Sequence, residues 1–204
     1  MDVEAVGAAG DAATAGRDGE GNPEAAARQI CLRMLTTAPR TRAQLADALR
    51  RRGVPDDVAE EVLGRFADVK LIDDAMFATA WVESRHHGRG LSGRALAAEL
   101  RHRGVGSEDI QAAVGHLGPE QEIATARSLV ARKLAATRGQ PVPARMRRLV
   151  GVLARKGYSP SLAYRVAREA LEQEGADLAA AGVDLTELPD ESGGEMADEE
   201  FGEP

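Results

Sequence analysis

The sequence predicts an all-α protein of three tandem three-helix modules, each resembling a helix-turn-helix, between two disordered acidic ends. Only six of the 204 residues are aromatic, whereas β-strands favour aromatic and β-branched side chains. A nine-residue pattern recurs at 45–53, 96–104 and 149–157, and its final glycines lie 51 and 53 residues apart, a period typical of stacked helical units. Helical periodicity with clear stop signals fills the middle of the chain but not its ends.

The disordered extensions are expected at residues 1–23 and 174–204. Residues 1–27 carry a net charge of −5 and residues 173–204 carry −11, and both are too poor in large apolar residues to offset the entropy of ordering. Residues 28–172 carry +9. This basic centre indicates a polyanionic or acidic partner, although surplus arginine that only keeps the helices soluble explains the charge equally well.

The first module is expected at residues 24–70. Its first helix follows Asn22-Pro23, and Thr41-Arg42-Ala43-Gln44 has the form of a capping box for the second. The third helix carries the apolar pair Val58 and Val62.

The second module is expected at residues 71–118. Phe77 and Trp81 are four residues apart on its first helix, and this pairing favours a core position for Trp81 over stacking on a nucleic-acid base. Ser92 is the expected N-cap of the second helix, and Ser107 that of the third.

The third module is expected at residues 119–173, with a first helix from about Pro119. Ser159-Pro160 has the form of an N-cap followed by the first helical residue, and the last helix then carries Leu162 and Val166.

The pattern shared by the modules is a helix with an apolar i, i+4 pair, a basic last turn and a C′ glycine that can adopt a positive φ. The second leucine of each pair is expected to be buried in its own module: Leu49, Leu100 and Leu153. The glycines are Gly53, Gly104 and Gly157.

Catalytic, metal and cofactor sites are not expected. The sequence has no H-E-x-x-H motif and no nucleotide-binding glycine loop, and its one cysteine, Cys31, is expected to be a buried thiol. His86 and His87 are assigned to a helix C-terminus, where positive charge suits the helix dipole. No apolar run is long enough to span a membrane and no secretory signal is visible, so we expect a cytoplasmic protein that is not an enzyme.

The candidate binding residues are basic. Arginine suits bidentate recognition of phosphate or carboxylate. The candidates are Arg51, Arg52, Arg94, Arg101, Arg103, Arg145, Arg147, Arg148, Arg155 and Lys156. The basic residues just before the glycines can be explained without a partner, because a positive charge offsets the negative end of the helix dipole at a C-terminus. It does not explain four that are expected near helix N-termini, where the dipole disfavours cations: Arg94, Arg145, Arg147 and Arg148.

Residues 28–172 resemble the RecX regulatory proteins, which modulate the RecA recombinase. The most specific stretch is 71–78, LIDDAMFA, followed by an Arg/Gly-rich link into Arg103-Gly104-Val105. Residues 155–159, RKGYS, resemble the basic-Gly-aromatic turn of the family's third module. Met76 departs from the pattern, since the family commonly has a basic residue there, so no binding role is transferred to it.

The resemblance implies an elongated, curved, monomeric chain that lies in the groove of the RecA–DNA filament. It implies inhibition of RecA's ATP hydrolysis, strand exchange and coprotease activities, and so modulation of recombination, DNA repair and the SOS response, without a cofactor. Single- and double-stranded DNA are expected as weaker, salt-dependent partners. One alternative is a helix-turn-helix regulator that recognises DNA directly, usually as a dimer, for which no coiled-coil heptad is visible. Another is a protein-binding scaffold with negligible DNA affinity.

Overall fold

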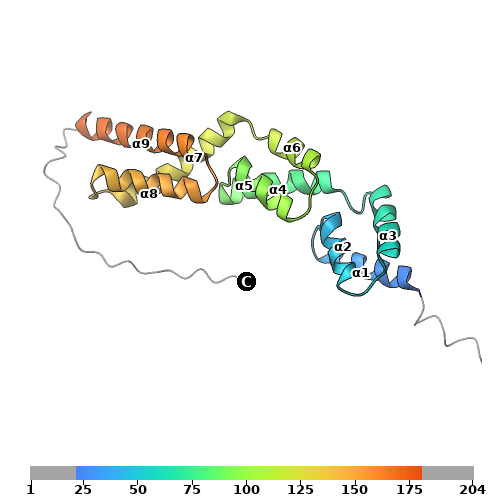
Figure 1. Ribbon diagram of the computed structural model, residues 1–204. Helices are drawn as coiled ribbons and strands as arrows, with labels where there is room; N and C mark the ends of the chain where they lie inside the picture. The colour runs from blue at the N-terminus through green and yellow to red at the C-terminus, as the bar shows by residue number, and fades with distance from the viewer. Residues whose placement is uncertain (1–21, 181–204) are drawn as a thin grey trace, which may run out of the picture. The chain divides into compact units, whose positions relative to one another are not determined.

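The computed structural model describes residues 22–180, with side chains as far as residue 175, as nine α-helices and one short 3₁₀ helix (Figure 1). This part of the chain contains no β-strand, so the all-α prediction is confirmed. None of its helices is long and apolar enough to cross a membrane.

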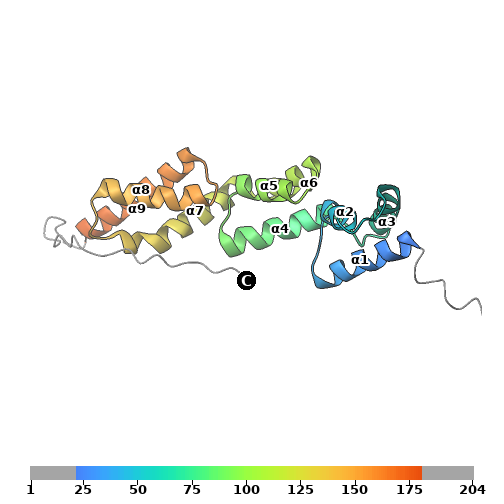
Figure 2. The ribbon, with the colours of Figure 1, turned by 60° about the horizontal axis from the view of Figure 1, so that its bottom comes forward.

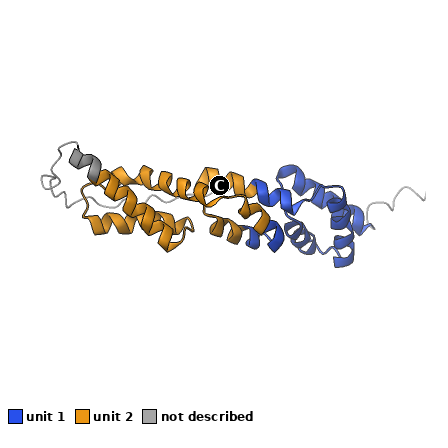
Figure 3. Ribbon diagram, turned by 90° about the horizontal axis from the view of Figure 1, so that it is seen from above, with its two compact units in different colours: residues 1–80, 100–110 blue, residues 81–99, 111–204 orange. Residues whose placement is uncertain are grey.

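Contacts divide the chain into two compact units. The first takes in residues 1–80 and 100–110, and the second residues 81–99 and 111–204 (Figure 3). The division falls within the three helices of the middle module, so each unit contains one complete terminal module and part of the middle one.

The first module consists of α1 (Pro23–Thr37), α2 (Arg42–Arg50) and α3 (Asp56–Asp68). The Asn22 side chain caps α1, and the predicted capping box of α2 forms at Thr41. One apolar side from each helix meets in a common core, whose most deeply buried members are Ala27, Cys31, Leu45, Leu49, Val62 and Leu63.

The second module consists of α4 (Asp74–Arg89), α5 (Gly93–His102) and α6 (Ser107–Gly115). Ser92 caps α5 as predicted, because its hydroxyl accepts the Ala95 amide at 3.3 Å. The predicted cap of α6 is wrong by one residue: Ser107 is already helical, and the Gly106 carbonyl accepts the first helical bond, from the Ile110 amide at 3.0 Å.

The third module consists of α7 (Pro119–Leu134), the 3₁₀ turn η1 (Ala135–Thr137), α8 (Val142–Arg155) and α9 (Pro160–Ala180). The three α-helices run beside one another (Figure 2) and enclose a second core. Its most deeply buried members are Ala126, Val130, Leu149, Leu153, Tyr158, Ala163, Val166 and Ala167.

The nine-residue pattern folds into the same turn three times. In each turn the residue after the glycine donates its amide to the leucine carbonyl five residues back, and the glycine donates to the residue three back, as in a Schellman motif. The glycine φ angles are +74°, +77° and +86°. All three predicted core leucines have an exposed fraction of 0%, which confirms the repeat: Leu49, Leu100 and Leu153.

Truncating one of these leucines is expected to leave a cavity that its module cannot close. Leu49→Ala should lower the free energy of unfolding by about 2–5 kcal/mol, measured by urea denaturation. Leu32→Ala is the control, because Leu32 in α1 is 43% exposed and its loss opens no cavity. Equal effects of the two substitutions would contradict the repeat assignment.

The boundary of the acidic C-terminal tail differs from the prediction. Helix α9 continues to Ala180, so a tail that starts at residue 174 is wrong by seven residues. The physical reason is Glu174, which is 7% exposed and is paired with two arginines. The predicted disorder of residues 1–21 and 181–204 lies outside the described residues.

Candidate partner-binding surface

In the first unit, part of the predicted basic surface is occupied by contacts with α2, the helix that precedes it. The guanidinium of Arg51 forms an ion pair with Asp47 one turn earlier, and that of Arg52 donates to the Ala48 carbonyl at 3.1 Å. Arg101 is exposed and has no hydrogen bond or ion pair to any residue that the structure describes, whereas Arg103 is half-buried. Of these four candidates, only Arg101 offers an uncommitted charge.

The basic turns of the second and third modules also serve as joints between modules. In the first unit the Thr41 hydroxyl, at the start of α2, donates to the carbonyl of Arg103 at 2.7 Å. In the second unit the Ser92 amide, at the start of α5, donates to the carbonyl of Lys156 at 2.9 Å. Each turn therefore holds the N-terminus of the second helix of the preceding module.

Arg94 belongs to the second of these joints. It is the second residue of α5, as expected from the sequence, and its Nε donates to the Gly157 carbonyl at 3.1 Å. This bond explains a cation at a helix N-terminus without any external anion. Arg94 is nevertheless exposed, so its terminal nitrogens still face solvent.

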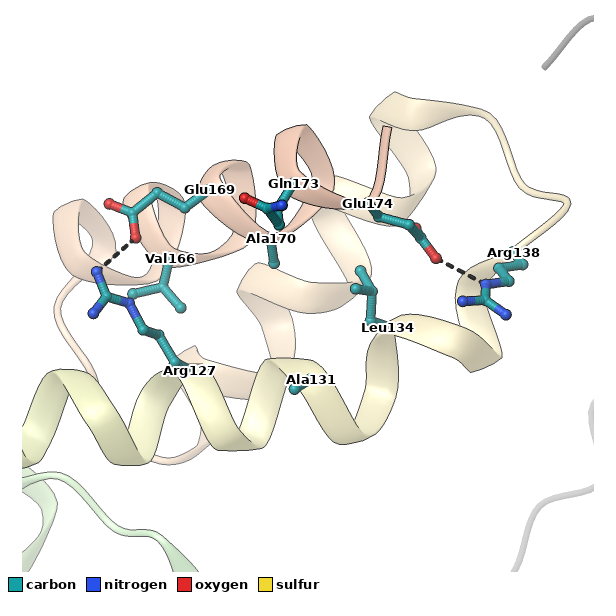
Figure 4. Close-up of a pocket in the computed structure, with 9 residues that line it drawn as sticks. All are labelled: Arg127, Ala131, Leu134, Arg138, Val166, Glu169, Ala170, Gln173 and Glu174. Atoms are coloured by element: carbon teal, nitrogen blue, oxygen red, sulfur yellow. Dashed lines mark hydrogen bonds and ion pairs between the residues drawn. The ribbon is translucent and has the colours of Figure 1, made fainter. Parts of the chain in front are cut away.

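Arg145 is an internal residue of the third module. Its side chain is only 13% exposed and forms an ion pair with Glu174 on α9, while its Nε donates to the Thr137 hydroxyl at 3.0 Å. Arg138 holds the other carboxylate oxygen of Glu174 at 2.8 Å (Figure 4). Because Arg145 is occupied in this way, we leave it out of the proposed binding surface.

Two opposing effects set the pKa of Glu174. Burial raises it, but the hydrogen bonds and positive charges of Arg145 and Arg138 outweigh burial, so the pKa lies below its ordinary value of 4.5. A carboxylate whose pKa is lowered on folding stabilises the fold above the unfolded pKa, and that stabilisation is lost as the pH falls through the folded pKa.

Glu174→Gln is therefore expected to lower the free energy of unfolding at pH 7 by about 1–3 kcal/mol, since two cations lose their partner. It should also make unfolding less pH-dependent below about pH 4.5, because the titrating group is gone. Glu172→Gln is the control: Glu172 is 65% exposed and its pair with Arg168 contributes little. Identical denaturation curves for the two variants at pH 7 and pH 4 would contradict a stabilising role for Glu174.

A groove of about 590 Å³ lies between α7 and α9 (Figure 4). Its floor is apolar and is formed by Ala131, Leu134, Val166 and Ala170. Arg127 is paired with Glu169 at 3.0 Å on one side, and Arg138 is paired with Glu174 on the other. Because α9 supplies a carboxylate for each arginine, the groove offers apolar contact rather than an anion site.

The solvent-facing side of α8 carries the clearest candidate surface, which we call the α8 face: Arg147, Arg148 and Arg155. All three side chains are exposed and make no hydrogen bond or ion pair to any described residue. Helical spacing places them on the half of α8 opposite Leu149 and Leu153, around Gly151. The surrounding residues 119–173 carry eleven Lys and Arg against four Asp and Glu. The α8 face is therefore a concentrated positive charge with no counter-ion among the residues that the structure describes.

Arg147 and Arg148 do not lie near a helix N-terminus, contrary to the prediction. Helix α8 begins at Val142, so Arg147 and Arg148 lie in its second turn rather than at its N-terminus. Their candidacy rests instead on exposure and on the lack of a partner among the described residues.

His86 lies in the last turn of α4, as predicted, but its side chain is buried. His86 is 2% exposed: its Nδ1 lies 2.8 Å from the Leu91 carbonyl and its Nε2 lies 2.8 Å from the Thr125 hydroxyl. A carbonyl only accepts, so Nδ1 is the donor, and His86 joins α4 to the following link and to α7. Among the described residues no cluster of His, Cys, Asp and Glu suits a metal ion.

Trp81 lies outside the core. It is half-buried, its Nε1 donates to Glu99 at 2.8 Å, and the Arg85 guanidinium lies 4.3 Å from the centre of its ring. The prediction of a core tryptophan is wrong because these polar contacts with α4 and α5 hold the ring near the surface.

Family models for the three three-helix domains of RecX match the chain at residues 27–66, 73–114 and 120–167. The chain is 61% identical over 175 residues to regulatory protein RecX of Thermobifida fusca (strain YX), which covers 82% of this chain and 95% of that protein. It is 47% identical over 155 residues to regulatory protein RecX of Mycolicibacterium smegmatis, covering 74% and 82%.

Two solved structures share the fold. The crystal structure of RecX from Lactobacillus salivarius is similar with a TM-score of 0.67 at 17% identity, over 72% of this chain and 96% of that chain. A crystal structure of regulatory protein RecX is similar with a TM-score of 0.64 at 25% identity, over 72% of both chains.

Proposed function

The chain belongs to the RecX family of regulatory proteins, and on that premise we propose that it binds the RecA–DNA filament and inhibits RecA. Inhibition would extend to ATP hydrolysis, strand exchange and coprotease activity, and so to recombination, DNA repair and the SOS response. The protein would act as a cytoplasmic monomer and without catalysis of its own.

The observation that carries this proposal is the α8 face. Uncommitted arginines suit either DNA phosphates or partner carboxylates, both of which a nucleoprotein filament offers. Weak contacts made by several linked modules add up to strong binding when they engage together. A filament, which repeats its binding sites, satisfies that condition better than a single DNA site does.

The direct test is a titration of this protein into RecA with single-stranded DNA while ATP hydrolysis is followed. We expect inhibition at stoichiometric amounts, and its absence would overturn the proposal. A parallel titration against duplex DNA alone tests the alternative of a direct DNA-binding regulator. Tight, sequence-dependent binding to duplex without any effect on RecA would favour that alternative.

The acidic C-terminal extension is expected to weaken binding to naked DNA. Residues 181–204 contain nine Asp and Glu and no Lys or Arg, and they are tethered directly after the basic third module. Such a tether gives a high effective concentration, about millimolar, so the extension competes with phosphate.

Removing residues 181–204 leaves α9 whole and should tighten DNA binding at low salt. It should also steepen the salt dependence, because each regained phosphate contact adds about 0.7–0.9 to the log–log slope. The difference should shrink above about 0.15 M salt, where the Debye length is about 8 Å. Equal affinity and equal slope for the two proteins at low salt would show that the extension is inert.

A further inference from the structure

The three Schellman turns have the same internal hydrogen bonds, but only two of them pack against the N-terminus of another helix. A Cβ built on Gly104 would overlap the Cβ of Ala43, two residues into α2. A Cβ built on Gly157 would lie 2.6 Å from the Cβ of Ala95 and 2.7 Å from the Ser92 hydroxyl. Both turns are therefore filled by a helix N-terminus that begins with Thr or Ser and continues with a small residue.

The equivalent turn of the first module is open. Gly53 has the same positive φ, +74°, yet no described atom lies within 4 Å of a Cβ built on it. The Arg52 carbonyl corresponds to the carbonyls of Arg103 and Lys156, which accept bonds from the docked helices. Within the described residues the Arg52 carbonyl accepts none.

A second copy of this chain does not supply the missing helix N-terminus through α8. Helices α2 and α5 are already docked, and α8 begins after Pro141 without a side-chain cap. The repeat places Arg145 where α2 has Thr41, and Arg145 is committed to Glu174. The repeat therefore ends at the third module, and no described helix of this chain docks on the first turn, which can receive one from a different protein.

We propose that the turn at Gly53 docks a helix N-terminus of the protein partner, one capped by Ser or Thr and followed within three residues by Ala or Gly. This inference rests on the proposed function, which makes that partner RecA in its filament. The two internal joints define what the turn accepts: a donor to the carbonyl before the glycine, and a small side chain against the glycine itself. Since Arg51 is already paired with Asp47, shape and hydrogen bonding govern this contact more than charge does.

Gly53→Asn tests the proposal. Asparagine tolerates a positive φ better than most residues, and its side chain enters open space, so the variant should fold with only a small loss of stability, matched by that of the control below. Its added atoms would fill the place of the docked helix, so binding to RecA on single-stranded DNA should weaken about tenfold or more. The loss should persist at high salt, because the contact is not mainly electrostatic.

Gly139→Asn is the matched control, since Gly139 has φ +80° and open space as well but lies in the link between η1 and α8. It should bind RecA like the parent. Parent-like binding by Gly53→Asn would overturn the docking turn and leave the proposed function intact. Destabilisation of Gly53→Asn as severe as that of Gly104→Asn would show that this chain fills its own turn, which also overturns the inference. Failure of the parent to bind RecA would overturn the proposed function and, with it, the assigned partner.

Discussion

Reversing the charge of the α8 face, as Arg147→Glu, Arg148→Glu and Arg155→Glu together, is expected to abolish inhibition of RecA's ATPase. The three side chains are exposed and make no bond to any described residue, so the variant should keep its helicity and melting temperature. Each charge-assisted contact contributes about 1.5–3 kcal/mol, so losing the set should weaken binding by about 100-fold or more. Affinity for the RecA filament, measured beside ATP hydrolysis, checks both parts.

A control of equal charge separates a defined face from general electrostatics. Arg132, Lys133 and Arg165 are exposed in the same module and have no partner among the described residues. Reversing these three changes the net charge by the same amount but leaves the α8 face intact, so inhibition should be largely retained. Equal loss in both triple variants would show that only the total charge of the third module matters.

The architecture was predictable because the repeated turn is built from local contacts. In the first turn the signal needs only Leu49 in the core, Gly53 at positive φ and Val54 just after it. These requirements lie within six consecutive residues, so they are visible in the sequence wherever the turn recurs. The caps at Asn22, Thr41 and Ser92 are local in the same way, and the structure contains all three.

The roles of individual arginines were not predictable, because their partners are distant in sequence. Arg145 binds Glu174, 29 residues later, and Arg94 binds the Gly157 carbonyl, 63 residues later. Arg147 and Arg148 are the same residue type on the same helix and remain uncommitted. In the sequence these four arginines look alike. Only the packing of α8 against α9 and the joint at Gly157 show which of them have internal partners.

A distant contact also explains why the predicted end of the third module is too early. Acid-rich composition alone assigns Glu174 to a disordered tail, but two arginines from the loop and helix before it turn this carboxylate into a buried anchor. His86 lies in the last turn of α4 as predicted, but the burial of its side chain could not be predicted, for a related reason. A place at the end of α4 does not by itself indicate any partner for the ring, whereas the Leu91 carbonyl and the Thr125 hydroxyl each lie 2.8 Å from a ring nitrogen. In each case a tertiary contact overrides the local signal.

The second large expected effect concerns the joint at Gly104. Gly104→Ala should lower the free energy of unfolding by about 2–5 kcal/mol. Positive φ costs alanine about 1–2 kcal/mol, and overpacking against Ala43 adds about 1–3 kcal/mol. Gly139 has a similar φ, +80° against +77°, but lies in open space, so Gly139→Ala should show only the first cost. Urea denaturation of both variants separates the cost of the backbone strain at positive φ from the cost of the collision with Ala43.

A second substitution, at Ala43, tests directly whether α2 and the turn at Gly104 are in contact. Apart from the two chain neighbours of Gly104, Ala43 is the only described residue with atoms within 4 Å of a Cβ built there, so Ala43→Gly should relieve the collision in Gly104→Ala while leaving the φ strain. Alone, Ala43→Gly should cost about 1 kcal/mol, the usual penalty for glycine in a helix. In the Gly104→Ala background it should instead be neutral or stabilising, giving a coupling of about 1 kcal/mol or more. Additive effects of the two substitutions would show that Ala43 and the turn do not meet, which would leave the hydrogen bond from the Thr41 hydroxyl to the Arg103 carbonyl to hold the joint.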